Sequence, residues 1–201
     1  TILSTREKTF LLKYKPWGVI LFSRNIKSLK QAKNLTGQIK KIFKDSNYPI
    51  LIDEEGGRVN RLKKIFDTKK FTGEFFGKLY EKDKKSFIHH YKTFIKLTSL
   101  LLKSIGVNIN TMPILDIRTK SASSIIGDRS FSTKPKVVSA IGDICITEFH
   151  SNKIGTVIKH IPGHGLAKVD SHKLTPHIKK SLRYLKKMIF QHLKINLAFL
   201  Q

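Results

Sequence analysis

The chain has 201 residues, 40% of them hydrophobic, which is enough for one medium-sized domain with its own core. It carries 39 lysine and arginine residues against 14 aspartate and glutamate residues, a formal net charge of +25. No apolar run is long enough to cross a bilayer or to serve as a signal peptide, and a single cysteine, Cys145, forms no internal disulfide, so we expect a cytoplasmic protein without a membrane partner.

Short apolar runs alternate with longer segments of helical periodicity. Four runs have the length and composition of buried strands: 17–22, 49–52, 107–115 and 155–158. Four segments carry apolar residues at helical spacing: 28–44, 86–105, 137–149 and, in the tail, 181–199. Ser28 is the expected N-cap of the first helix, and Gly106 is expected to end the second.

This alternation of strands and helices predicts an α/β fold with a mostly parallel sheet. Polar residues gather where the predicted strands end: Arg24, Asn25, 53–55, Asp116, Lys159 and His160. Active sites lie at the carboxyl ends of the strands both in a (β/α) barrel and in an open doubly wound sheet. The pattern therefore predicts where a site lies but does not choose between the two folds.

The first polar cluster is residues 52–61, Ile-Asp-Glu-Glu-Gly-Gly-Arg-Val-Asn-Arg. A carboxylate at a strand end, such as Asp53, can accept two neighbouring hydroxyls of a sugar, and an arginine such as Arg61 donates in a rigid fork. A polar loop with internal salt bridges explains the segment equally well. The second cluster, 126–131, is weaker, because a turn with one ion pair accounts for it.

The third cluster is the strongest: Lys-His-Ile-Pro-Gly-His-Gly at 159–165, followed by Asp-Ser-His at 170–172. Histidine titrates near neutrality, and an adjacent carboxylate can fix its tautomer and hold it as a proton donor. A metal site is the weaker interpretation, because the chain has no His-Glu-x-x-His helix and no cysteine pair. The density of histidine and glycine in one loop favours a functional role.

Taken together, these clusters resemble glycoside hydrolase family 3, in its bacterial β-N-acetylglucosaminidase branch. Lys-His-x-Pro-Gly-His-Gly, four residues and Asp-Ser-His are that branch's signature, and 52–61 resembles its Ile-Asp-x-Glu-Gly-Gly-Arg-Val-x-Arg segment. Residues 18–25 and 126–131 also match, in the family's order. The resemblance covers nearly the whole chain, from residue 1 to about residue 194.

The resemblance implies a (β/α) TIM-like barrel, which typically needs about 250 residues. We expect residues 1–201 to be one barrel catalytic domain, truncated at the C-terminus to about the first half to two-thirds. The implied activity releases terminal non-reducing β-N-acetylglucosamine, with retention, from muropeptides or chito-oligosaccharides. A small saccharide is thus the expected partner, no cofactor and no metal are implied, and the oligomeric state stays open.

The resemblance also assigns roles to individual residues. His172 matches the family's general acid/base and Asp170 its partner. The substrate-binding positions are matched by Asp53, Arg61, Arg129, Lys159 and His160. The family's nucleophile is an aspartate after a later strand, for which these 201 residues contain no counterpart, and we expect the chain alone to be inactive and poorly soluble. Glu54, where the family commonly has glutamine, is expected to add a negative charge near the site.

Three other functions stay open: an inactive, truncated sugar-binding relative, a basic nucleic-acid-binding protein, and a β-glucosidase of the same family. The net charge favours an anionic partner such as nucleic acid. However, the lysines are spread along the whole chain, whereas a nucleic-acid site concentrates charge and interleaves aromatic residues. We therefore regard a nucleic-acid partner as disfavoured. The Asp170/His172 pair argues against a β-glucosidase.

Overall fold

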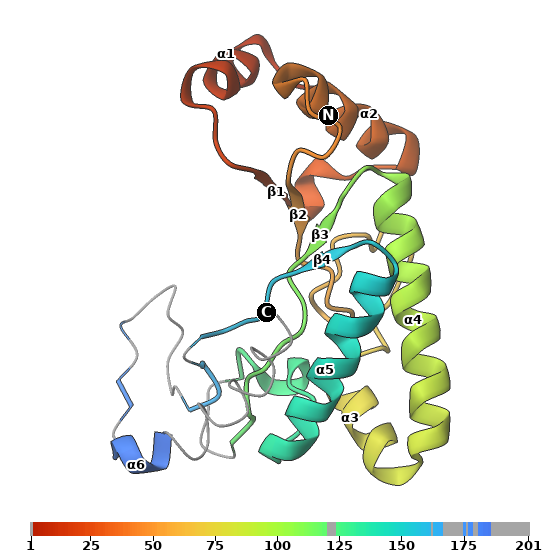
Figure 1. The fold of residues 1–201 in the computed structure, drawn as a ribbon, viewed down its shortest axis with the longest axis vertical. Helices are drawn as coiled ribbons and strands as arrows, with labels where there is room; N and C mark the ends of the chain where they lie inside the picture. The colour runs from red at the N-terminus through yellow and green to blue at the C-terminus, as the bar shows by residue number, and fades with distance from the viewer. Residues whose placement is uncertain are drawn as a thin grey trace.

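A four-stranded, entirely parallel sheet forms the centre of the computed structural model, which describes residues 2–119, 124–161, 163–166, 175, 177–178 and 181–185 (Figure 1). Its strands, in spatial order, are β1 (Val19–Leu21), β2 (Ile50–Ile52), β3 (Ile109–Asn110) and β4 (Gly155–Thr156). Spatial order equals chain order, as in a (β/α) barrel, whereas a doubly wound sheet reverses its order at a switch point. The predicted α/β fold is confirmed.

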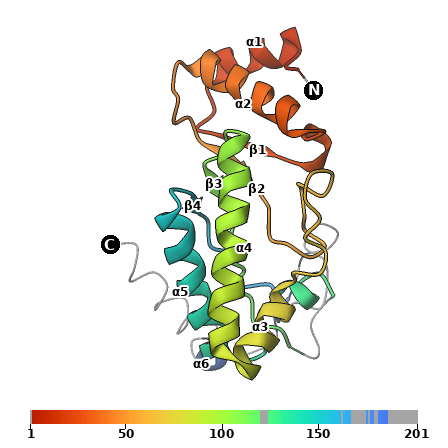
Figure 2. The same cartoon turned by 90° about the vertical axis from the view of Figure 1, so that its right-hand side faces the viewer.

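Helices connect successive strands. They are α2 (Leu29–Phe43), α4 (Lys84–Ser104) and α5 (Pro135–Ser151), and α4 and α5 run side by side in both views (Figures 1 and 2). Ser28 caps α2 as predicted, since its Oγ accepts a hydrogen bond from the Gln31 amide at 3.2 Å. The second predicted helix also ends before Gly106.

The core lies between the sheet and the inner stripe of these helices. The α4 side chains that face it recur at helical spacing and are almost completely buried, among them Phe87, Tyr91, Ile95 and Leu102. Cys145 of α5 is also fully buried, and burial raises the pKa of its thiol to about 12. The lone cysteine is therefore a core residue held in the thiol form.

Two helices were not predicted, α1 (Thr5–Tyr14) and α3 (Gly73–Lys82). Ser4 and Glu7 form a capping box at the start of α1, with the Ser4 amide 2.7 Å from Glu7 Oε2. At α3, Thr72 Oγ1 accepts from the Phe75 amide at 3.0 Å. Both caps can be read in the sequence, and the apolar residues of α3 recur at helical spacing, but each of these helices is only ten residues long.

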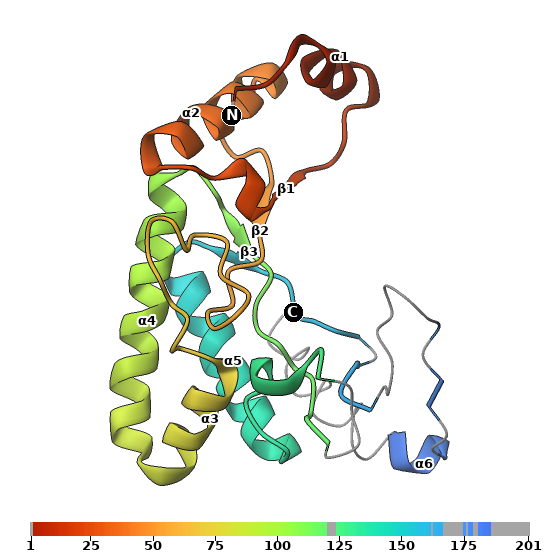
Figure 3. The same ribbon diagram turned by 180° about the vertical axis from the view of Figure 1, so that it is seen from behind.

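The long loop between β2 and α3 lies beyond the carboxyl ends of the strands (Figure 3). The predicted strand 107–115 is regular only at β3, with a further single bridge between Ile114 and Lys159. From the predicted tail helix, the structure describes α6 (Leu182–Leu185), and most of 181–199 lies outside the described residues. Among the described helices, none has the length and hydropathy needed to cross a membrane.

Candidate active site

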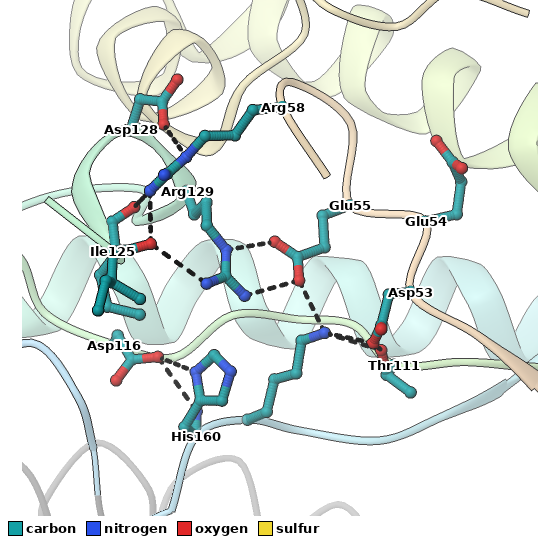
Figure 4. A network of polar contacts seen from close by, with 12 residues as sticks. Asp53, Glu54, Glu55, Arg58, Thr111, Asp116, Ile125, Asp128, Arg129 and His160 are labelled. Atoms are coloured by element: carbon teal, nitrogen blue, oxygen red, sulfur yellow. Dashed lines mark hydrogen bonds and ion pairs between the residues drawn. The ribbon is translucent and has the colours of Figure 1, made fainter. Parts of the chain in front are cut away.

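Side chains from neighbouring strand ends meet at one edge of the sheet (Figure 4). Asp53 follows β2, Thr111 follows β3, and Lys159 lies beyond β4. The Lys159 ammonium is 2.9 Å from Asp53 Oδ1 and 2.8 Å from Thr111 Oγ1, and the Thr111 hydroxyl donates to the same Asp53 oxygen. Because all four strands are parallel, their carboxyl ends share this edge, which confirms the predicted position of the polar residues.

Glu55 extends this contact into a chain of alternating charges. Its Oε1 lies 2.7 Å from Lys159 Nζ, and its two oxygens accept from Arg129 Nε and Nη2, both at 2.8 Å (Figure 4). The Glu55 side chain is 3% exposed and that of Arg129 is 13% exposed. Burial would lower the pKa of Arg129, but the hydrogen bonds and charge of Glu55 raise it, so the guanidinium stays cationic.

Asp53 is held as a carboxylate. Burial would raise its pKa, but hydrogen bonds from Thr111 and Lys159, the charge of Lys159 and a hydrogen bond from Arg61 lower it to about 2. Arg61 Nη2 lies 3.2 Å from Asp53 Oδ2. Asp53 is therefore an acceptor for hydroxyl groups at any pH above about 3, with two cations beside it.

His160 and buried Asp116 form a second contact (Figure 4). Asp116 Oδ2 lies 2.6 Å from His160 Nδ1 and 3.2 Å from the His160 amide, and Asp116 Oδ1 accepts from the His164 amide. Burial would raise the pKa of Asp116, but the hydrogen bond and charge of His160 lower it. An ionised Asp116 accepts the Nδ1 proton of His160, which leaves Nε2 as the ring nitrogen that is not committed to Asp116. Asp116 was predicted only as a strand-end polar residue.

Arg58 joins the first two polar clusters. Its Nε lies 3.1 Å from Asp128 Oδ1, and its Nη2 donates to the carbonyls of Ser124 at 2.6 Å and Ile126 at 3.0 Å. The segment 124–129 carries Arg129, so Arg58 holds the backbone that presents that guanidinium. The sequence predicted a turn with one ion pair here, and the partner of Asp128 lies 70 residues away.

Glu54, which was expected to add negative charge near the site, has its side chain buried in the loop that follows β2. Glu54 is 1% exposed and points away from Asp53 and Glu55 (Figure 4). Its Oε2 accepts from the amides of Arg61 and Leu62 at 2.7 and 3.0 Å. Burial raises its pKa to about 7, although these hydrogen bonds lower it. Glu54 therefore holds the loop between β2 and α3 together.

The proposed acid/base pair, Asp170 and His172, lies outside the described residues. The described residues that precede them, 163–166, are held by the contacts of His164 with Asp116 and by Thr119 Oγ1, which donates to the Gly165 carbonyl at 2.9 Å. In the part of the chain that the structure describes, no three His, Cys, Asp or Glu side chains are grouped as metal ligands.

Five of the seven predicted site residues are described, and the structure brings them together: Asp53, Arg61, Arg129, Lys159 and His160. Glu55, Thr111, Asp116 and Arg58 join them, and no role was predicted for these four.

Fixed carboxylates beside fixed cations offer an acceptor and a donor to each hydroxyl of a polyhydroxylated ligand. Fold and site thus define a (β/α)-barrel protein with a charged site suited to a polyhydroxylated ligand. It belongs to glycoside hydrolase family 3, because the model described as Glycosyl hydrolase family 3 N terminal domain matches residues 3–194.

Two curated relatives carry the name beta-hexosaminidase. The one from Hydrogenovibrio crunogenus is 33% identical over 172 residues, which cover 86% of this chain and 47% of the relative. The one from Aromatoleum aromaticum is 32% identical over 174 residues, which cover 87% of this chain and 48% of the relative. The chain thus spans about half the length of these relatives.

Among solved structures, native NagZ from Neisseria gonorrhoeae superposes with a TM-score of 0.87 at 28% identity, covering 97% of this chain and 56% of that chain. The same protein in complex with N-trifluoroacetyl-D-glucosamine also gives a TM-score of 0.87, at 27% identity, covering 96% of this chain and 57% of that chain. The barrel-like fold is thereby shown independently of the motifs.

Proposed function

We propose that this chain is the N-terminal part of the catalytic domain of a retaining β-N-acetylhexosaminidase. On this proposal it releases terminal non-reducing β-N-acetylglucosamine from peptidoglycan- or chitin-derived saccharides in the cytoplasm. The observation that carries the proposal is the convergence of Asp53, Lys159 and His160, with Arg61 and Arg129 beside them, at adjacent strand ends. The relatives' name and the N-acylated glucosamine bound by the gonococcal protein support this substrate class.

Asp53 would accept hydrogen bonds from sugar hydroxyls, and Lys159 and Arg61 would donate to the same hydroxyls. His160 would use Nε2, because its Nδ1 is committed to Asp116. Each contact is charge-assisted or partly buried, which makes it stronger than an exposed neutral hydrogen bond. These residues would therefore hold one sugar and leave the bond cleavage to other groups.

In the proposed reaction, His172, oriented by Asp170, protonates the leaving glycosidic oxygen while a carboxylate attacks the anomeric carbon. A water deprotonated by His172 then releases the glycosyl-enzyme, so the configuration is retained overall. Asp53, Glu55 and Asp116 are each ion-paired with a cation or histidine, and none of the three is positioned as a free nucleophile. We therefore place the nucleophile outside the described residues.

The test uses the full-length product of the gene that encodes this chain. We expect it to hydrolyse p-nitrophenyl N-acetyl-β-glucosaminide, and His172→Ala to lower kcat/KM by roughly 10²–10⁴-fold for a poor leaving group. The loss should be smaller for p-nitrophenol, which needs little protonation. His150→Ala is the matched control, because His150 is exposed at the end of α5, where its Nε2 lies 2.9 Å from Thr156 Oγ1.

Full activity of His172→Ala on the poor leaving group would disprove the acid role of this histidine. Absence of turnover by the wild-type full-length protein would reject the hydrolase proposal as a whole.

A further inference from the structure

A second, basic cavity opens beside the loop that follows β2. It has a volume of about 600 Å³ and is lined by Ser23, Gly57, Arg58, Asn60, Arg61, Lys63, Lys64, Asp67 and Lys69. Five of these nine residues are lysine or arginine, whereas the whole chain has 39 such residues among 201. The cavity is therefore nearly three times richer in cations than the chain, and the overall composition does not explain it.

Three of the five cations in the lining have no ion-pair partner among the described residues. Arg58 is paired with Asp128 and Arg61 with Asp53. Lys63, Lys64 and Lys69 are exposed, and within the described residues none of these three ammonium groups has an ion-pair partner. Asp67 is the single acid in the lining, so the three free lysines leave the cavity with a net positive charge.

The cavity borders the site already described. Arg61 belongs to both, because its side chain lines the cavity and its Nη2 lies 3.2 Å from Asp53. Gly57 and Arg58 also line a smaller depression that reaches Glu55 and Arg129. A saccharide held by Asp53 would therefore have its neighbouring part beside the free lysines.

We propose that this basic cavity binds an anionic group, a carboxylate or a phosphate, carried by the saccharide whose sugar Asp53 holds. The inference rests on the proposed function and adds to it a separate cationic subsite for a charged part of the saccharide. Lysine suits such a role because its ammonium is a mobile point charge that attracts an anion without demanding one geometry. Exposed charges of this kind are screened by salt, so their effect should decline above about 0.1 M ionic strength.

The experiment compares three N-acetyl-β-glucosaminides with the full-length protein: one with a neutral leaving group, one whose leaving group bears a carboxylate, and one phosphorylated on O6 of the sugar. The variant is Lys63→Glu/Lys64→Glu. At low salt we expect kcat/KM to fall about tenfold for one of the two anionic substrates, and to change less than about twofold for the neutral one. The substrate that responds tells whether the anion belongs to the leaving group or to the sugar.

Two further variants separate this effect from others. Lys96→Glu/Lys103→Glu changes the net charge by the same amount on the exposed side of α4, away from the cavity lining. This variant should leave the ratio of kcat/KM for the anionic substrates to kcat/KM for the neutral one unchanged. Lys63→Gln/Lys64→Gln tests the same site without charge reversal, and should give a smaller fall. If both Lys63/Lys64 variants keep the wild-type ratio of kcat/KM for anionic and neutral substrates, and turn over the neutral substrate normally, the proposal is overturned. The proposed function would then stay intact. No turnover of any substrate by the wild type would overturn both.

Discussion

Asp53, Glu54 and Glu55 are consecutive acids that occupy three different environments. Asp53 faces Lys159 and Arg61, and these contacts keep its pKa at about 2 despite burial. Glu55 makes a bidentate pair with Arg129. Glu54 points the other way, and burial raises its pKa to about 7. The difference between Asp53 and Glu54 arises from the partners that the fold supplies, because burial disfavours the charged form of both.

Glu54→Gln is expected to stabilise the protein above pH 7. With a pKa raised from 4.5 to about 7, folded Glu54 binds more protons than the unfolded chain between these values, so stability falls as pH rises through this interval. The substituted glutamine side chain would still accept from the amides of Arg61 and Leu62 and could donate to Thr68 Oγ1. We expect a gain of about 1–3 kcal/mol at pH 8 and almost none at pH 4.5.

Urea unfolding of the full-length protein and of its Glu54→Gln variant at pH 5, 6, 7 and 8 measures this gain. Glu74→Gln is an informative comparison, because hydrogen bonds from Arg118 and Lys78 lower the pKa of Glu74 to about 2. The contribution of ionised Glu74 to the free energy of unfolding is present above pH 4.5 and is lost as pH falls toward 2. Glu74→Gln should therefore destabilise the protein at neutral pH. An identical pH dependence in Glu54→Gln and wild type would contradict the assignment.

At the scale of elements, α3 positions Arg129 through close backbone contact. A Cβ added at Gly77 would lie 1.6 Å from the Phe131 carbonyl oxygen, and one at Gly73 would lie 2.1 Å from the Arg129 carbonyl oxygen. The helix can approach the segment 129–131 this closely only because it presents glycine. The unpredicted helix α3 is thus part of the support for the site, together with the Arg58 contacts to 124–128.

Gly77→Ala should therefore destabilise the protein by roughly 1–3 kcal/mol, as overpacking does, although alanine favours helices more than glycine. Gly37→Ala is the matched control, because Gly37 lies within α2 and a Cβ there would meet no atom within 4 Å. We expect that control to gain up to about 1 kcal/mol. Urea unfolding measures both, and equal effects of the two substitutions would contradict the proposed contact.

At the scale of the whole molecule, charge and sheet edges set the behaviour of the chain. The net charge of +25 is carried partly by exposed lysines on several helices, for example Lys8 on α1, Lys33 on α2 and Lys96 on α4. Outside the basic cavity, the lysines are spread over several helices, whereas a nucleic-acid-binding surface concentrates its positive charge. The nucleic-acid hypothesis stays a disfavoured and untested prediction. Within the described residues, β1 and β4 each have one edge without a strand partner.

We expect the 201-residue polypeptide by itself to show no turnover of p-nitrophenyl N-acetyl-β-glucosaminide. A four-stranded sheet encloses the proposed site on one side only, and the acids in the described site are already committed to ion pairs. Unpaired strand edges also favour association, so size-exclusion chromatography should show aggregates. Turnover at the rate of the full-length protein would contradict this expectation.

The sequence by itself determined the four strands, the helices α2, α4 and α5, the parallel sheet and the motifs that place the chain in its family. These features are local, since apolar periodicity, N-caps and short motifs are read within about ten to twenty residues. Tertiary structure alone decided the strand order that selects a barrel, the pairing of Arg58 with Asp128 and of Glu55 with Arg129, and the burial of Glu54. These two ion pairs join residues that lie 70 and 74 positions apart in the chain, which no local pattern brings together. The roles of Asp170 and His172 stay predictions.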